Sequence, residues 1–290
     1  MTPIKLGRLS RHAWTCVLVC LTLASCSEGP LDPKGPVGKA ERLILLDATA
    51  IMLAVGVPVI LLTFCFAWWF RSGNSRARYR PDWEYSGRIE MIVWSIPALI
   101  ILFLGGIAWI GAHDLDPPAS LKSSAAPLEV QVVSVDWRWI FIYPQQGIAS
   151  VDRLTVPAGV PIHFRLTSTS VMNSFFIPQL GSQIYTMPGM ATQLNLLAEH
   201  PGTYPGLSAQ FSGDGFSDMR FDVAAVAAAE FQSWVDTTHA AGGVLDRPTF
   251  EQLARPSSEH AVRTYGEVTT GLFDSIVAAH VGMTHASAQE

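Results

Sequence analysis

The stretch Leu128-Glu-Val-Gln-Val-Val-Ser-Val-Asp-Trp-Arg-Trp-Ile-Phe-Ile-Tyr143 decides the fold of the larger part of this 290-residue chain. It is rich in β-branched and aromatic residues with partial alternation, which is typical of β-strands. Shorter runs of the same kind follow, separated by turn residues such as Pro157-Ala-Gly159. Regular short strands with Gly and Pro between them predict a β-sandwich or barrel. The further expected strands are Leu154–Val156, Ile162–Thr167, Phe175–Pro178, Gln193–Leu197 and Arg220–Val223.

Past this β-region the pattern becomes helical. Ala225–His239 is rich in Ala and carries Phe231 and Trp234 on one face. Thr249–Ala254 and Gly271–His280 are shorter helix candidates. We therefore assign residues 113–224 to the β-domain and residues 225–290 to a C-terminal helical region and tail.

The first third of the chain is far more apolar than the rest. Overall, 49% of the residues are hydrophobic, 15% are charged and the mean hydropathy is +0.28. Residues 43–70 and 91–112 are apolar runs long enough to cross a bilayer, so they predict two transmembrane helices. The loop between them, residues 71–90, is expected in the cytoplasm because it is rich in arginine. Its arginines are Arg71, Arg76, Arg78, Arg80 and Arg88.

The N-terminus has the pattern of an export signal. Basic residues precede Ala13–Ala24, an apolar run that is too short to span a membrane. It is followed by Ser25 and Cys26, so that Leu23-Ala-Ser-Cys26 has the bacterial lipoprotein pattern, in which the chain is cleaved before the cysteine and the cysteine is lipidated. We expect a signal peptide at 1–25 and a linker at 26–42 that starts with lipidated Cys26. The alternative is an ordinary signal peptide with an incidental cysteine.

Charge and cysteine content narrow the function of the β-domain. From Ala112 to Glu290 there are 8 Lys and Arg against 17 Asp and Glu, so nothing indicates nucleic acid binding. An acidic face can attract a basic protein, although it also simply favours solubility. None of the four cysteines lies after Cys65. The β-domain therefore has no disulfide, thiolate metal site or nucleophilic cysteine.

One segment of the β-domain has the spacing of a copper site without its ligands. Gly206-Leu-Ser-Ala-Gln-Phe-Ser-Gly-Asp-Gly-Phe-Ser-Asp-Met219 follows the rhythm C-x-x-x-C-x-x-x-H-x-x-M. Ser208 and Ser212 occupy the thiolate positions, and Phe216 occupies the imidazole position. A dinuclear copper centre needs thiolate sulfur and imidazole nitrogen. Met219 is retained, but a thioether alone is a weak ligand, so we expect no metal here.

With this segment and the helix pair, the chain resembles subunit II of the haem–copper respiratory oxidases. The resemblance covers nearly all of the mature chain and implies a cupredoxin domain after a two-helix hairpin. The family's V-x-H-S-F segment corresponds to Val171-Met-Asn-Ser-Phe175, with Asn173 at the histidine position. Gln210 corresponds to the glutamate that binds copper through its backbone carbonyl. Four of the five side-chain ligands are thus replaced.

Within this family the chain looks most like the quinol oxidase branch, and within that branch it most resembles subunit II of the bo-type ubiquinol oxidases. The resemblance is carried by Asp136–Pro144, Val171–Pro178, Leu180–Tyr185, Pro201–Tyr204 and Ser212–Phe216. It implies a membrane-anchored all-β chain: a transmembrane hairpin, a cupredoxin-like β-sandwich or barrel without CuA, and a C-terminal helical extension. We expect a non-redox, structural subunit of a proton-pumping oxidase that couples ubiquinol oxidation to reduction of oxygen to water.

The same resemblance sets the expected partners and location. The chain itself should bind no cofactor, and the haems and CuB should belong to subunit I. Subunits I, III and IV, membrane lipid, and ubiquinol as the substrate of the complex are the expected partners, whereas cytochrome c is not. The expected location is the bacterial inner membrane, with the β-domain and both mature termini in the periplasm.

Two residues keep alternative interpretations. Glu90 corresponds to a glutamate at the mouth of a proton channel of subunit I, but it can equally be a carboxylate that the helix N-terminus favours. Trp137 matches the aromatic site at which copper-bearing relatives receive electrons, yet packing explains it better. Two other functions remain open: a copper-bearing subunit of a cytochrome c oxidase, and a free-standing membrane lipoprotein.

Overall fold

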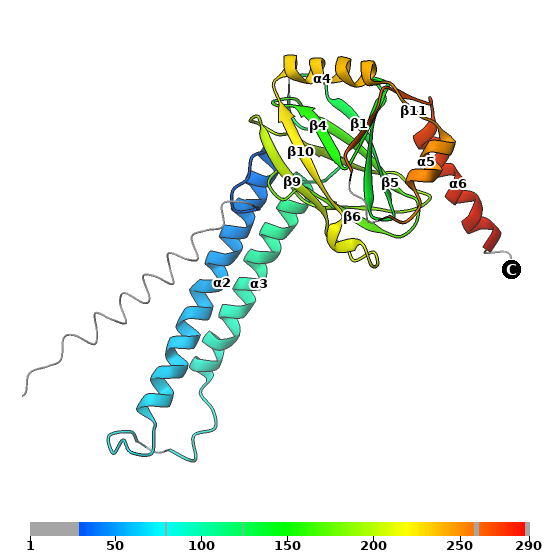
Figure 1. Cartoon of the computed structure of the whole chain (residues 1–290). Helices are drawn as coiled ribbons and strands as arrows, with labels where there is room; N and C mark the ends of the chain where they lie inside the picture. Colours follow the sequence, from blue (N-terminus) through cyan, green and yellow to red (C-terminus); the bar gives the residue numbers. More distant parts are fainter. Residues whose placement is uncertain (1–28, 79, 124, 258–260, 288–290) are drawn as a thin grey trace, which may run out of the picture. The chain divides into compact units, whose positions relative to one another are not determined.

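The computed structural model describes residues 29–78, 80–123, 125–257 and 261–287 (Figure 1). It contains two compact units. One is a helical hairpin formed by Ala40–Asp116, and the other combines the chain from Pro117 onwards with the described residues up to Lys39. Cys26, the predicted lipidation site, lies outside the described residues.

The hairpin consists of two long apolar helices, α2 (Pro36–Trp69) and α3 (Gly87–Asp114). Both are long and apolar enough to cross a membrane. Each begins before the predicted boundary, since residues 36–42 and 87–90 are already helical. For α2 the sequence signal is Pro36, because proline is favoured at the first position of a helix. The expected linker is therefore shorter than residues 26–42.

The β-domain is a sandwich of two sheets, as the strand pattern predicts. The first has the order β12-β3-β2-β1-β5-β8 and the second β4-β10-β9-β6-β7. Neighbouring strands are antiparallel except for the parallel pairs β1–β5 and β4–β10. The strands of the sandwich are β1 (Leu128–Val135), β2 (Arg138–Tyr143), β3 (Ile148–Val151), β4 (Arg153–Pro157), β5 (Ile162–Ser168), β6 (Asn173–Phe176), β7 (Ile184–Thr186), β8 (Thr192–Leu196), β9 (Gly202–Ser208), β10 (Arg220–Val226) and β12 (Arg263–Tyr265).

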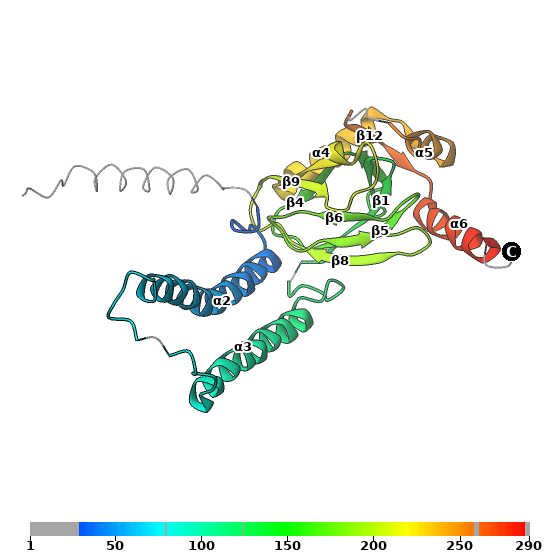
Figure 2. The same cartoon turned by 90° about the horizontal axis from the view of Figure 1, so that it is seen from below.

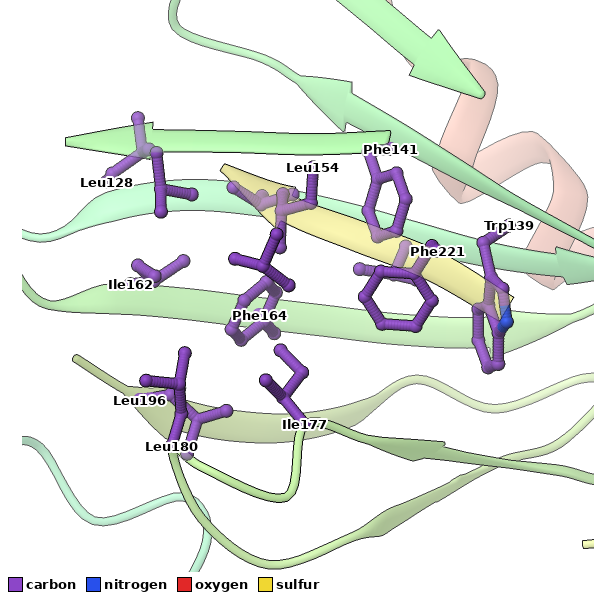
Figure 3. Packing of buried hydrophobic residues seen from close by; sticks show 14 of the residues in the cluster. Leu128, Trp139, Phe141, Leu154, Ile162, Phe164, Ile177, Leu180, Leu196 and Phe221 are labelled. Atoms are coloured by element: carbon purple, nitrogen blue, oxygen red, sulfur yellow. The ribbon is translucent and has the colours of Figure 1, made fainter. Parts of the chain in front are cut away.

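The stretch 128–143 is apolar on both faces because it contacts two separate cores. Alternate residues of β2 point in opposite directions. Trp139 and Phe141 enter the core between the two sheets, where they lie with Phe164 and Phe221 (Figure 3). Ile140 and its alternate neighbours enter a second core on the outer face of the first sheet. This double burial explains why alternation in the sequence is only partial.

The C-terminal region contains the predicted helical extension and, in addition, three short strands. Its helices are α4 (Ala228–Ala241), α5 (Arg247–Leu253) and α6 (Leu272–Ser287). However, β12 pairs with β3 and thereby extends the first sheet, and β11 (Val244–Leu245) pairs with β13 (Glu267–Val268). Strands of two or three residues carry no readable period, so the sequence did not predict them. Residues of α4 enter the inter-sheet core, whereas α5 and α6 cover the outer one (Figure 2).

The chain before α2 is also part of the β-domain instead of a free linker. The Lys34 amide donates to the carbonyl of Gln179 at 2.7 Å, and the Glu199 amide donates to the carbonyl of Lys34 at 3.0 Å. A Cβ at Gly35 would lie 2.3 Å from the carbonyl oxygen of Leu197, so only glycine allows this approach. These backbone contacts hold residues 29–39 against the domain.

Candidate functional site

The positions of the lost copper ligands come together at one end of the sandwich. Asn173 begins β6 and Ser208 ends β9, and the register of these strands pairs Phe175 with Ser208. The Ser208 amide donates to the carbonyl of Met219 at 3.0 Å. The connection between β9 and β10, which contains the short 3-10 helix η1 (Phe216–Asp218), protrudes at this end (Figure 1). The spacing in the sequence therefore corresponds to a real cluster in space.

Hydrogen bonds join three of these residues in place of metal bonds. Asn173 and Ser208 are 1% and 3% exposed. The Ser208 hydroxyl lies 3.2 Å from Asn173 Oδ1 and 3.3 Å from the carbonyl oxygen of Gln210, and its proton can go to either acceptor. Asn173 Nδ2 donates to the carbonyl of Val171 at 3.2 Å. Buried polar groups need partners, and here they find them within the domain.

The remaining positions are filled by packing. Met219 is buried, and the half-buried Ser212 places its hydroxyl 4.0 Å from the Met219 sulfur. Phe216 is also half-buried, and its ring meets the exposed ring of Phe211 at 5.6 Å between centroids. Phe216 thus packs at the rim of the cluster. The sequence alone indicated only that it would fill space near the missing metal.

Trp137 is held by the same loop. It has a φ of 71°, and its indole N–H donates to the carbonyl of Ser212 at 3.0 Å. A Cβ at Gly215 would lie 2.4 Å from Cδ2 of the Trp137 ring, so the loop needs glycine there. The ring is half-buried and packs against the inter-sheet core. This environment agrees with the packing interpretation of Trp137.

These donors do not fit a dinuclear copper centre. The cluster offers hydroxyl and amide groups and one thioether, whereas copper of this type needs thiolates and imidazoles. Across the described ranges, no group of three or more His, Cys, Asp and Glu side chains is placed to hold a metal ion. These groups can stabilise the loop end of the domain through hydrogen bonds and packing, but they do not supply the ligands of a dinuclear copper centre.

Exposed apolar side chains lie on the segments next to the cluster, and the sequence did not indicate their exposure. We call this group the loop-end patch. It comes from the loop before β6, from β7, from the β7–β8 loop and from the β9–η1 loop, which backbone hydrogen bonds join at Ser174–Ala209 and Ser168–Met187. Phe211 is its most exposed member at 72%. The patch consists of Val171, Met172, Tyr185, Met190 and Phe211.

Glu90 lies in the first turn of α3, as expected. Ser86 occupies the N-cap position, and the Glu90 amide donates to its carbonyl at 3.0 Å. The Glu90 side chain is exposed in this chain. A carboxylate in a first turn is favoured by the helix dipole, so its position is compatible with both interpretations of this residue.

Comparisons with known proteins agree with these features. The family model for the cytochrome c oxidase subunit II periplasmic domain matches residues 143–226, and the model for the COX aromatic rich motif matches residues 239–283. Ubiquinol oxidase subunit 2 of Acetobacter aceti is 49% identical over 262 residues, which cover 90% of this chain and 85% of that protein.

More distant relatives have similar names. Cytochrome bo(3) ubiquinol oxidase subunit 2 of Pseudomonas aeruginosa is 45% identical over 267 residues, covering 92% of this chain and 81% of that protein. Quinol oxidase subunit 2 of Bacillus subtilis is 36% identical over 243 residues, covering 83% of this chain and 76% of that protein. The similarity therefore spans the hairpin, the sandwich and much of the C-terminal region.

Proposed function

The chain belongs to the ubiquinol oxidase subunit 2 family, and we propose that it is the non-redox subunit II of a proton-pumping terminal quinol oxidase. The complex would oxidise ubiquinol and reduce oxygen to water. The haems and CuB would reside in subunit I, and this chain would shape and stabilise the assembly together with subunits III and IV. The β-domain and both mature termini would face the periplasm from the bacterial inner membrane.

The observation that carries the proposal is the hydrogen-bonded cluster at the former ligand positions. Ser208 bonds to Asn173 or Gln210, and Asn173 bonds to the backbone, in the place where thiolate and imidazole would bind copper. A chain that passed electrons from cytochrome c through copper would need a cysteine in this domain, and there is none after Cys65. Electrons that do not enter here are supplied in the membrane by quinol.

The loop-end patch supports a role in assembly. Exposed apolar side chains that gather on one surface are typical of a protein interface. The helices α2 and α3 also leave almost all of their surface to lipid or to other proteins, because Gly38 is the only buried residue in these two completely described helices. A free-standing lipoprotein would leave both surfaces without a protein partner.

The copper content of the purified oxidase tests the non-redox role. The account predicts no copper beyond that of the oxygen-reducing centre, and no near-infrared absorption from a mixed-valence copper pair. Reconstitution with copper and a reductant should not change either result. Additional copper that remains with this subunit after its separation from subunit I would show that the cluster binds metal.

We also propose that Glu90 contributes to proton delivery at the cytoplasmic end of α3. Ionisable side chains at the ends of membrane helices often line proton routes. Glu90→Gln in the assembled oxidase should lower both turnover and proton uptake. Glu84→Gln changes an exposed carboxylate in the loop just before α3 and serves as the matched control. If Glu90→Gln and Glu84→Gln both keep wild-type rates, Glu90 has only a structural role.

Lipidation of Cys26 is a further part of the proposal. The acyl chains would add membrane affinity to an already spanning chain. Mass spectrometry of the mature N-terminus should find an acylated cysteine as its first residue. Cys26→Ser should remove this mass while the subunit stays in the membrane through α2 and α3.

A further inference from the structure

A cavity in the β-domain, away from the former ligand positions, concentrates positive charge. Its volume is about 230 Å³, and it is formed by β2, β12, α5 and the chain that follows α5. Residues 112–290 contain 8 Lys and Arg, and three of them line this one cavity: Arg138, Arg255 and Arg263. No carboxylate is among the described residues that complete the lining, and three of these carry a hydroxyl group: Thr249, Ser257 and Tyr265. We call this cavity the arginine pocket.

The first sheet brings two of the arginines to one face. Arg138 begins β2, two residues before Ile140, and alternate residues of a strand share a face. Ile140 pairs with Val151 of β3, and Val151 pairs in turn with Arg263 of β12. Both arginines therefore lie on the outer face of this sheet, where α5 and the chain after it pack beside β12 (Figure 2). Arg255 lines the pocket from that following segment.

The guanidinium group of Arg138 is a fixed donor in this pocket. Arg138 is 6% exposed, and its Nη2 donates to the hydroxyl of Ser257 at 2.6 Å. Arg138 and Arg263 also have other interactions, whereas the side chain of Arg255 makes no hydrogen bond or ion pair with a residue that the structure describes. The pocket thus combines one buried, immobilised guanidinium with two exposed ones that can adjust to a ligand.

These features select the class of ligand. Guanidinium groups bind phosphate and carboxylate oxygens through short, charge-assisted hydrogen bonds, often two at a time. The hydroxyl groups of Thr249 and Tyr265 can donate to the same oxygens. The volume of the pocket lies below the roughly 300–1,000 Å³ that is typical of pockets for larger organic ligands. The arginine pocket is therefore suited to a small oxyanion.

We propose that the arginine pocket binds a small oxyanion, a phosphate or carboxylate group, between β2, β12 and α5. The anion would accept hydrogen bonds from the three arginines and thereby hold α5 and the chain after it against the first sheet. Its source is either a free anion such as inorganic phosphate or the phosphate of a lipid headgroup. The inference does not rest on the proposed function, because it uses only contacts within the β-domain.

Binding of inorganic phosphate to the purified oxidase tests the site. Equilibrium dialysis with radiolabelled phosphate at constant ionic strength should find a saturable site that Arg255→Gln weakens by about tenfold or more, because hydrogen bonds to a charged group are lost. Arg247→Gln is the matched control. It removes the same charge from α5, but Arg247 pairs with Glu251 at 2.8 Å and does not line the pocket. Both arginines are exposed, so neither change should unfold the domain.

Mass spectrometry of the lipids that copurify with the oxidase distinguishes the two sources. A headgroup in the pocket predicts an anionic phospholipid that Arg247→Gln keeps and Arg255→Gln loses, and phosphate binding only after delipidation. A free anion predicts the same lipid content in both variants and phosphate binding without delipidation. Either result supports the arginine pocket and identifies the source of its ligand.

Two results would overturn the inference. One is phosphate binding that the wild type lacks, or that Arg255→Gln leaves unchanged, both before and after delipidation. The other is phosphate binding that appears only in Glu259→Gln, a change outside the described residues. The carboxylate of the chain itself would then be the anion of this pocket. In both cases the evidence for the proposed function would be unaffected.

Discussion

At the loop end of the β-domain, polar side chains at the former ligand positions bond within their own domain. In the α2–α3 hairpin, by contrast, Asp47 and Asp114 have no partner among the described residues. Ser208 and Asn173 are almost completely buried and share a hydrogen bond of 3.2 Å. The first region is complete in the single chain, and the second is not.

The difference separates a region whose polar groups are satisfied within one chain from a region whose polar groups are not. A cupredoxin-like sandwich remains stable without copper when hydrogen bonds satisfy the buried groups that remain. The hairpin has no internal core of this kind, so its apolar surface and its carboxylates require other molecules. The proposed function therefore assigns the role of the chain to its contacts with partner subunits, and the cluster would preserve the shape that presents them.

The largest expected effect concerns the stability that the core of the β-sandwich provides without a metal ion. Phe175 is fully buried and stacks on Phe221 at 5.1 Å between ring centroids, with Trp139 at 5.3 Å. Phe175→Ala should lower the free energy of unfolding by about 3–5 kcal/mol, because it leaves a cavity in the core. Thermal unfolding of the purified subunit measures this loss. A metal chelator should not change the unfolding temperature of the wild type, and a large decrease would show that an ion stabilises the domain.

The hydrogen-bonded cluster should give a smaller effect. Ser208→Ala leaves buried acceptors without their donor and should cost about 1–3 kcal/mol of stability. Turnover with ubiquinol should stay at the wild-type rate, since the cluster does not carry electrons. Ser217→Ala is the matched control on the same loop, at an exposed position, and should change stability by less than about 0.5 kcal/mol. Slower electron entry in Ser208→Ala at unchanged stability would contradict a purely structural cluster.

The loop-end patch should matter for assembly and not for folding. Phe211→Ser removes its most exposed ring and should weaken retention in the complex by about 1 kcal/mol, roughly fivefold. The unfolding temperature of the subunit should not fall. Val262→Ser makes a comparable change on a different exposed loop and should leave retention unchanged. Equal retention of both variants in the complex would show that the loop-end patch is not part of the interface.

The smallest expected effect is on the pH dependence of stability, and it concerns a residue outside both regions. Asp246 caps α5 by accepting from the Thr249 amide at 2.9 Å, and the hydrogen bonds from Thr249 lower the pKa of this carboxyl. Because the pKa of this carboxyl is lower in the folded than in the unfolded protein, its ionisation stabilises the fold at pH values above the unfolded-state pKa. This stabilisation is lost as the pH falls through the folded-state pKa. Asp246→Asn should therefore slightly reduce the difference in stability between about pH 7 and about pH 3. An unchanged difference would show that the negative charge of Asp246 contributes nothing measurable, because asparagine still caps the helix.

The sequence predicted the parts of the molecule that depend on local patterns. Long apolar runs identify α2 and α3, and the fixed spacing from Ser208 to Met219 identifies a cluster that the fold brings together. The packing of residues 29–39 against the β-domain could not be predicted in this way, because backbone amides and carbonyls hold this segment to Gln179 and Glu199. These groups are the same in every residue and leave no side-chain signal.

Tertiary features of the candidate sites were equally hidden. The local sequence does not indicate that Phe211 and Met172 are exposed, and only the structure shows their exposure. The sequence assigned Asp114 to the β-domain, whereas the structure places it at the end of α3. Exposure and pairing between distant segments depend on the complete fold, which periodicity does not encode.

The identity of the electron donor tests the central claim most directly. Oxygen uptake by the purified complete oxidase should be rapid with ubiquinol and absent with reduced cytochrome c, at low as well as at high ionic strength. The account predicts this result because no copper in this subunit can accept electrons from a soluble cytochrome. Turnover with cytochrome c in the absence of quinol would contradict it.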